Sequence, residues 1–77
     1  MKEYVHRLRD LRIDRELSQV QIAVILGTTK NQVGKYERGE QEMPIRHLIT
    51  LCNYYGVSAD YVLGLPEGRP YGFSKTK

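Results

Sequence analysis

The chain has 77 residues, in which 12 Lys and Arg outnumber nine Asp and Glu and give a formal net charge of +3. This length is enough for one compact core and leaves no room for a separate catalytic or effector-binding domain, and no apolar run approaches the roughly 20 residues of a membrane span. The single cysteine, Cys52, excludes an internal disulfide and leaves no thiol pair for a metal, so we expect a cytoplasmic protein without a metal or a cofactor.

The first expected helix covers Tyr4–Glu16. Its apolar residues recur at intervals of four and three with charged residues between them, which is the period of one helical face. The residues on this face are Tyr4, Leu8 and Leu11.

The second expected helix covers Gln19–Leu26. Ser18 and Gln21 form a capping-box pattern at its start, in which the hydroxyl and the amide satisfy each other's exposed backbone N–H groups. Gly27 follows the helix and can adopt the left-handed conformation that ends it without a steric penalty. The residues expected to be buried are Ile22, Ala23 and Leu26, with Val20 partly covered.

The third expected helix covers Lys30–Arg38 and follows the second after a very short turn. Thr29 and Gln32 repeat the capping-box pattern, and Gly39 is expected to end the helix. At about 100° per residue, one side of this helix carries all of its apolar residues. This inner set is Thr29, Val33, Tyr36 and Glu37. The outer set is Lys30, Asn31, Gly34, Lys35 and Arg38.

Two more helices are expected before residue 66. Pro44 starts the fourth, since a first helical turn does not need the N–H that proline lacks, and Gly56 ends it. Ser58 caps a last short helix that ends before Gly64. The expected inward face of the fourth helix is Ile45, Leu48, Ile49, Cys52 and Tyr55. The fifth helix offers Tyr61, Val62 and Leu63 for burial, while His6 and His47 are expected at or near the surface.

These segments predict an all-α fold, a compact five-helix bundle that occupies residues 1–66. Repeated proline and glycine after residue 65 prevent regular structure, so residues 67–77 are expected to form a flexible tail. The second and third helices, joined by a tight turn, form a helix-turn-helix unit. In such a unit the later helix fits the DNA major groove and the earlier one crosses the phosphate backbone.

The outer face of the third helix carries side chains of the kinds that hydrogen-bond to base edges in DNA. Lysine donates to guanine O6 and N7, and asparagine pairs with adenine N6 and N7, so Lys30, Asn31 and Lys35 are expected to contact bases. An ordinary solvated helix face is the alternative interpretation of the same residues. The sequence contains no nucleophile with a base partner and no phosphate-binding glycine loop, so we expect no catalytic residues and no enzyme activity.

Four patterns in the right order resemble the lambda-repressor-like helix-turn-helix domains, also called the Cro/C1-type or XRE family. They are Leu17-Ser18-Gln19 followed by Ile22-Ala23, then Leu26-Gly27-Thr28-Thr29, then Tyr36-Glu37-Arg38-Gly39, and finally residues 55–64. The resemblance covers roughly Tyr4 to Leu65. It implies a protein that binds double-stranded operator DNA as a homodimer and regulates transcription, most often as a repressor.

The resemblance also implies residue roles. The base-reading positions are Thr29, Lys30, Asn31 and Lys35. The expected phosphate contacts are Gln19, Gln32 and Arg38, and the expected structural ion pair is Arg12 with Glu37.

A protein-interaction module, such as an antitoxin or a scaffold in a complex, is the alternative function for the same fold. Tyr71 and Phe73 in the tail would then form a docking segment that orders on binding. Neither a membrane nor a small-molecule ligand is expected as a partner.

Overall fold

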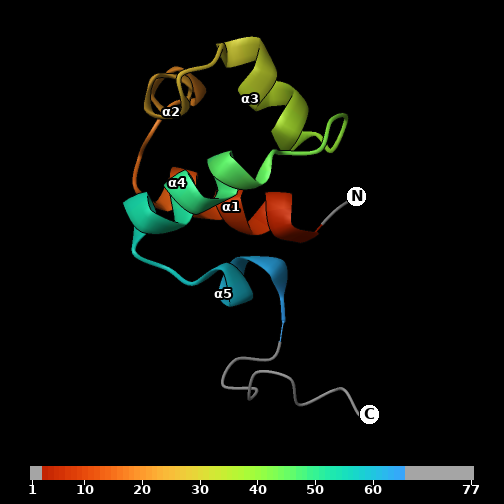
Figure 1. The fold of residues 1–77 in the computed structure, drawn as a ribbon. Helices are drawn as coiled ribbons and strands as arrows, with labels where there is room; N and C mark the ends of the chain where they lie inside the picture. The colour runs from red at the N-terminus through yellow and green to blue at the C-terminus, as the bar shows by residue number, and fades with distance from the viewer. Residues whose placement is uncertain (1–2, 66–77) are drawn as a thin grey trace.

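The computed structural model describes residues 3–65, and this part of the chain contains five helices. They are α1 (Glu3–Asp14), α2 (Gln19–Leu26), α3 (Lys30–Glu37), α4 (Ile45–Tyr55) and α5 (Ala59–Leu63). The α2–α3 pair forms one end of the molecule and α5 the other, with α1 and α4 between them (Figure 1). The predicted all-α five-helix fold is therefore confirmed, whereas the expected tail at residues 67–77 lies outside the described residues.

The bounds of α2 agree with the sequence prediction because both of its ends are fixed locally. The backbone N–H of Gln21 donates to Ser18 Oγ at 3.1 Å, and the N–H of Ser18 donates to Gln21 Oε1 at 2.7 Å. Gly27 ends the helix with a φ of 70°, in the left-handed region that glycine enters without strain. The predicted capping box and glycine stop are both confirmed.

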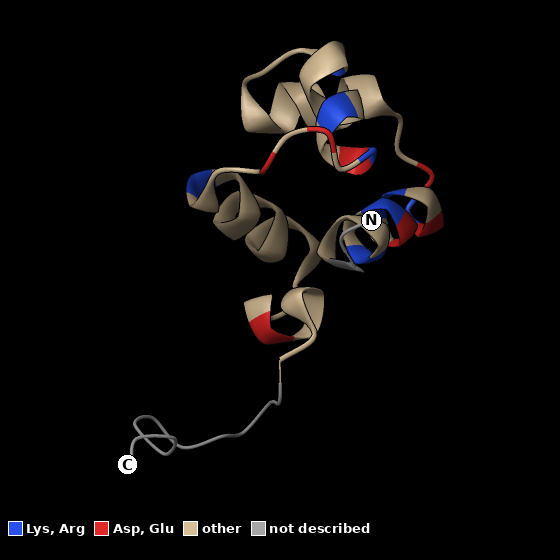
Figure 2. Cartoon of the chain, turned by 90° about the vertical axis from the view of Figure 1, so that its right-hand side faces the viewer, with Lys and Arg blue, Asp and Glu red and all other residues tan. Residues whose placement is uncertain are grey.

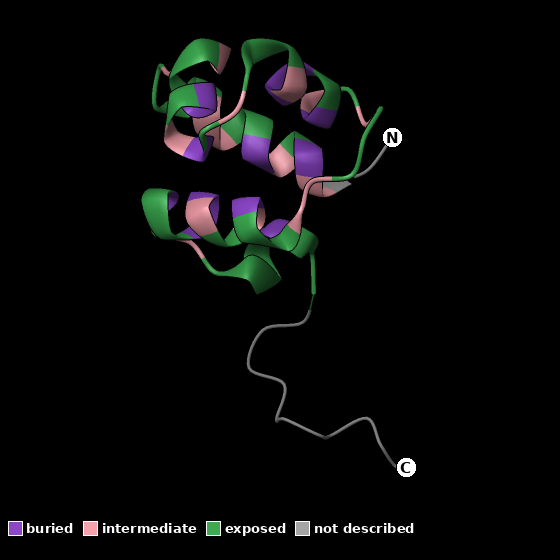
Figure 3. Cartoon of the chain, turned by 45° about the horizontal axis from the view of Figure 1, so that its top comes forward, coloured by how far each residue is buried: buried purple, intermediate pink, exposed green. Residues whose placement is uncertain are grey.

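One apolar core joins the helices, and their outer faces are exposed (Figure 3). Val5 and Val62, from α1 and α5, are its most completely buried side chains. The apolar spacing of α1 predicted the burial of Leu8 correctly. It missed Val5, which is one residue after Tyr4 in the chain and is also buried. The cluster of buried residues is Leu8, Ile22, Ala23, Leu26, Val33, Tyr36, Leu51, Cys52, Tyr55 and Val62.

The inward face of α4 differs from the prediction. Ile45 is 73% exposed and Ile49 is 54% exposed, so neither belongs to the core. The buried residues of the helix are His47, Leu51, Cys52 and Tyr55. The apolar stripe of α4 is wider than the surface that α2 and α5 cover, and packing against these two helices selects the side that is buried.

The α5 prediction is corrected in the same way. Val62 is buried, but Tyr61 is 47% exposed and Leu63 is also exposed. A helix of five residues rests on α1 and α4 with one side, so three consecutive residues cannot all face inward. Val20 of α2, expected to be partly covered, is exposed as well.

The end of α1 comes two residues earlier than predicted. The helix stops at Asp14, and Glu16 adopts a φ of 57°, a left-handed conformation that is uncommon for a residue with a side chain. The guanidinium of Arg12 donates from Nη1 to the carbonyl of Leu17 at 2.9 Å, which holds the turn beneath the start of α2. Within residues 3–65, no helix has the length and apolar character needed to cross a membrane.

His47 was expected at or near the surface, but it is buried in α4 with its ring edge-on to Tyr36 at a centroid distance of 6.0 Å. Burial, and secondarily the charge of Arg46, lowers the pKa of His47 below its ordinary value of 6.5. The unfolded chain therefore binds this proton more readily than the folded chain, and stability is lost as the pH falls through 6.5.

We expect the free energy of unfolding to decrease when the pH is lowered from about 7.5 to about 5.5, and the substitution His47→Phe to remove most of this dependence. Denaturant titrations at the two pH values measure it. The exposed His6 supplies the control, since His6→Asn is expected to leave the pH dependence intact. An unchanged dependence in His47→Phe would contradict the assignment.

Candidate nucleic-acid interface

The α2–α3 unit is held in one geometry by its turn and by its packing. The N–H of Thr28 donates to the carbonyl of Ala23 at 2.9 Å, and the N–H of Gly27 donates to that of Val24 at 3.2 Å. Thr29 then caps α3, because its Oγ1 accepts the N–H of Gln32 at 3.1 Å. Two helices of eight residues each are thereby joined by a turn of three, the arrangement of a helix-turn-helix.

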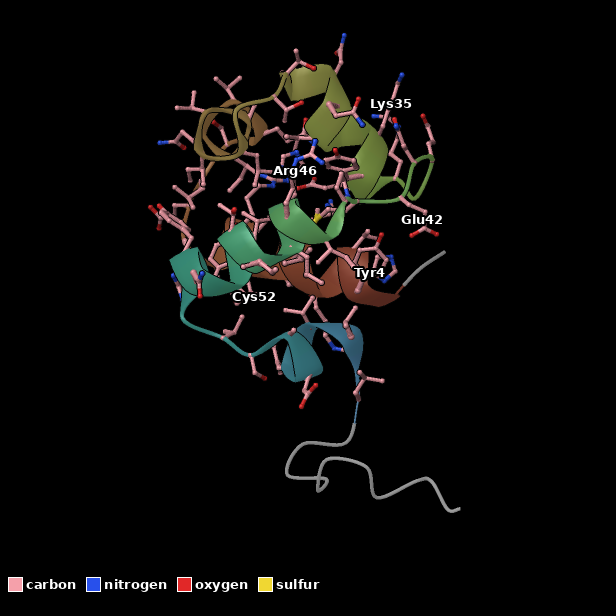
Figure 4. The ribbon with its side chains drawn as sticks, in the orientation of Figure 1. Tyr4, Lys35, Glu42, Arg46 and Cys52 are labelled. Atoms are coloured by element: carbon pink, nitrogen blue, oxygen red, sulfur yellow. The ribbon has the colours of Figure 1, made fainter. Side chains whose placement is uncertain are left out.

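The predicted base-reading residues are all exposed. Lys30, Asn31 and Lys35 lie on α3, whereas Thr29 is the N-cap of the helix and is exposed although its angle placed it in the inner set. The side chain of Lys35 points away from the body of the molecule (Figure 4). Val33 and Tyr36 on the opposite side are buried and attach the helix to the core.

The second capping box is only half formed. The side chain of Gln32 donates from Nε2 to Gln41 Oε1 at 2.8 Å, in the loop that follows α3. At 100° per residue, Gln32 and Glu37 lie about 140° apart around α3, so they are on different sides of the helix. α3 ends at Glu37, so Arg38, predicted to be its last residue, is the C-cap.

Gly34 was assigned to the outer face, but it is buried. The guanidinium of Arg38 covers it, and Nη1 lies 2.9 Å from the point where a Cβ of residue 34 would be. The side chain of a helical residue leans toward the preceding turn, which explains why Arg38 reaches the residue four positions earlier. Gly34 thus makes room for the guanidinium of Arg38 against α3.

Arg12 and Glu37 are brought together across α1 and α3. Arg12 donates from Nε to Glu37 Oε2 at 2.7 Å and from Nη2 to Oε1 at 3.0 Å, a two-point contact. Only 14% and 12% of the two side chains remain exposed. This ion pair fixes the end of α3 against α1, and so sets the angle at which the outer face is presented.

Gln19 also belongs to this ion-pair network. Its Nε2 donates to Glu37 Oε1 at 3.0 Å, which orients the amide at the start of α2. An amide nitrogen carries two hydrogens, so one donor of Gln19 remains to contact a phosphate. The residue expected to touch the DNA backbone is thereby held by the same carboxylate that anchors α3.

Arg38, the third expected phosphate contact, is paired within the chain. Its Nε donates to Glu40 Oε2 at 2.7 Å and its Nη2 to Oε1 at 3.3 Å. The hydrogen bond from Arg38 lowers the pKa of Glu40 below its ordinary value, so the carboxylate stays ionised at neutral pH. Figure 2 shows acidic positions in the loop after α3 and basic positions on α3 and on α1.

A hollow of about 410 Å³ lies where α1, the start of α2 and the end of α3 meet. Two of its residues, His6 and Arg9, had no functional role among the expectations drawn from the sequence. Their spacing is the missed signal, since His6, Arg9 and the paired Arg12 succeed one another at intervals of three on α1 and so share a face. The lining residues are His6, Arg9, Gln19, Glu37 and Arg38.

Comparison with known proteins gives one family. A family model described as a helix-turn-helix domain matches residues 3–62. The P22 c2 repressor, solved in complex with a synthetic operator, has a similar structure with a TM-score of 0.72 at 24% identity, covering 82% of this chain and 96% of that one. This likeness establishes a shared fold, and with the family match it confirms the predicted resemblance to lambda-repressor-like domains.

Curated relatives give the same picture. An uncharacterized HTH-type transcriptional regulator of Bacillus subtilis, YobD, is 39% identical over 64 residues, which are 83% of this chain and 57% of the relative. The CTXphi transcriptional repressor RstR of Vibrio cholerae is 37% identical over 51 residues, 66% of this chain and 46% of the relative. The chain thus spans about half the length of the curated relatives that it matches.

Proposed function

This chain belongs to the helix-turn-helix domain family, and we propose on that premise that it is a cytoplasmic transcriptional regulator, a repressor that binds operator DNA. The observation that carries the proposal is the exposure of Lys30, Asn31 and Lys35 on α3, and of Thr29 at its N-cap, on a helix that buried residues anchor to the core. Its relatives named as transcriptional regulators, one of them a repressor, support the same function.

The proposed docking places α3 in the major groove and the two flanking phosphate strands on its two sides. Gln19 and Arg38 lie toward one strand, and Gln32 lies toward the other. The charged and amide groups between them face base edges, where a good side-chain pair contributes roughly 1 to 3 kcal/mol of discrimination. Phosphate contacts position the protein, and base contacts supply the sequence preference.

We further propose that two copies bind one operator. One short helix reads few base pairs, and two half-sites about 34 to 36 Å apart are the usual solution. The exposed apolar side chains of α5, Tyr61 and Leu63, together with Leu65 beyond it, offer the surface for a second copy.

Selection of bound sequences from random duplexes tests the function and its symmetry in one experiment. A defined sequence is expected, with two inverted half-sites if a homodimer binds. Competition between the selected duplex and a scrambled duplex across a salt series then measures specificity. Equal affinity for both duplexes at every salt concentration would refute base reading, since phosphate contacts alone carry no sequence information.

Asn31→Ala is expected to relax the preference at one or two base pairs of the selected site, with a loss of roughly 1 to 3 kcal/mol on that site and little loss on scrambled DNA. Asn53 of α4 is also exposed and supplies the matched control, because Asn53→Ala removes the same amide outside the α2–α3 unit. Gln19→Ala is expected to weaken all duplexes alike. The same uniform loss in Asn31→Ala would show that Asn31 does not read a base.

A further inference from the structure

The hollow between α1 and α3 extends the proposed interface beyond the helix-turn-helix, and the inference below rests on the proposed function. Gln19 and Arg38, two of the expected phosphate contacts, form part of its wall. The remaining wall comes mainly from α1, which contributes His6 and Arg9. A phosphate that reaches Gln19 and Arg38 therefore also comes within the reach of α1.

The charge inside the hollow suits an anion. Glu37 is the acidic residue of its wall, and its carboxylate is already occupied by two donors of Arg12 and by one of Gln19. The Arg12 guanidinium balances that negative charge. Of the two further guanidinium groups of the wall, Arg38 is paired with Glu40, so Arg9 is the group that makes the hollow cationic.

The Glu40 carboxylate accepts hydrogen bonds from the same guanidinium nitrogens of Arg38 that a bound anion would contact. The carboxylate receives hydrogen bonds from Nε and Nη2, the two-point geometry in which arginine also binds a phosphate. The pair is more than half exposed on both sides, so water and ions have access to it. Gly34 leaves the space in which the guanidinium lies while it is paired.

We propose that the hollow seats one phosphate of the bound duplex between Arg9 and Arg38, and that Glu40 holds the guanidinium of Arg38 until this phosphate replaces it. Arg9 is then a DNA contact from α1. Glu40 is a positioning residue that opposes binding, since its carboxylate must be released before Arg38 can contact the backbone. An exposed ion pair is weak enough to be exchanged in this way.

The contact from Arg9 is tested by the salt dependence of binding to the selected duplex, with all 77 residues present. Arg9→Gln is expected to weaken binding roughly threefold or more and to lower the slope of log K against log salt by about 0.9 for each bound protomer. Arg46, an exposed arginine of α4 that is not part of the hollow, supplies the control. Equal slopes for Arg9→Gln and Arg46→Gln would overturn the contact from α1.

The role of Glu40 is tested by a double-mutant cycle. Glu40→Gln is expected to tighten binding roughly threefold or more, and this gain is expected to disappear in an Arg38→Gln background. Glu42→Gln removes the same charge from the same loop, and its smaller gain is expected to persist in that background. A gain from Glu40→Gln that persists without Arg38, or that Glu42→Gln matches, would overturn the role assigned to Glu40.

These outcomes are separable from a failure of the proposed function. If the wild-type chain binds no duplex more tightly than scrambled DNA, the regulator proposal itself is wrong. If it binds the selected duplex and Arg9→Gln leaves the slope unchanged, the function stands and only the phosphate seat is wrong.

Discussion

Glu37→Ala is expected to lower the free energy of unfolding by roughly 3 to 5 kcal/mol, because it leaves the Arg12 guanidinium charged, largely buried and without its carboxylate. Folded domains have roughly 5 to 15 kcal/mol in total, so the variant is expected to be marginally stable at room temperature. Gln19 loses its acceptor in the same variant, which adds to the loss. Chemical denaturation of wild type and variant measures the difference.

The exposed pair provides the matched control for this experiment. Glu40→Ala also removes a carboxylate that an arginine, Arg38, binds at two points. Both members of this pair are more than half exposed to solvent. We expect little or no change in stability from it, since water replaces the lost contact. Equal effects of Glu37→Ala and Glu40→Ala would contradict the view that burial makes the Arg12–Glu37 pair decisive.

Replacing Lys30 and Lys35 together with alanine is expected to weaken specific DNA binding strongly while leaving the fold intact. If each lysine contributes one base contact of roughly 1 to 3 kcal/mol, the pair accounts for roughly 2 to 6 kcal/mol, or a loss of roughly 30-fold or more in affinity. Both side chains are exposed on α3, so the thermal midpoint is expected to stay close to that of wild type.

A variant with arginine in place of both Lys30 and Lys35 distinguishes the loss of positive charge from a disturbance of the helix. It keeps both cations, so affinity for duplex DNA in general is expected to remain, with altered preference at the bases that the two residues read. Fluorescence anisotropy with selected and scrambled duplexes measures both quantities. Full affinity and unchanged preference in the double alanine variant would show that α3 does not enter the groove through these side chains.

The sequence predicted best those features that depend on neighbouring residues. Ser18 with Gln21 and the glycine at 27 define α2 through contacts made within one or two turns, and both helix ends agree with the structure. Thr29 capped α3 as expected, but its partner Gln32 contacts Gln41 instead of completing the box. The contact from Gln32 to Gln41 depends on the path of the loop after α3, and the spacing of residues 29 and 32 gives no information about that path.

Features that depend on tertiary packing were predicted less well. Ile45 and Ile49 belong to the same apolar stripe as the buried Cys52, and the choice between them is made by the helices that cover α4. Gly34 was placed by its angle around α3, which takes no account of an arginine side chain reaching back from position 38. The sequence therefore predicted the start and the exposed side chains of α3, whereas the contacts beside that helix depend on tertiary packing.

The turn between α2 and α3 has a consequence for the energetics of association. The N–H groups of Gly27 and Thr28 and the side chain of Thr29 are hydrogen-bonded within the protein, so the backbone of this turn is ordered before it meets DNA. Only side chains such as Lys35 and Asn31 have rotamer entropy to lose, roughly 0.5 to 1.5 kcal/mol for each that becomes fixed. If the proposed DNA binding is correct, we expect the ordered turn to add no heat-capacity change of coupled folding, and electrostatic steering to raise the association rate.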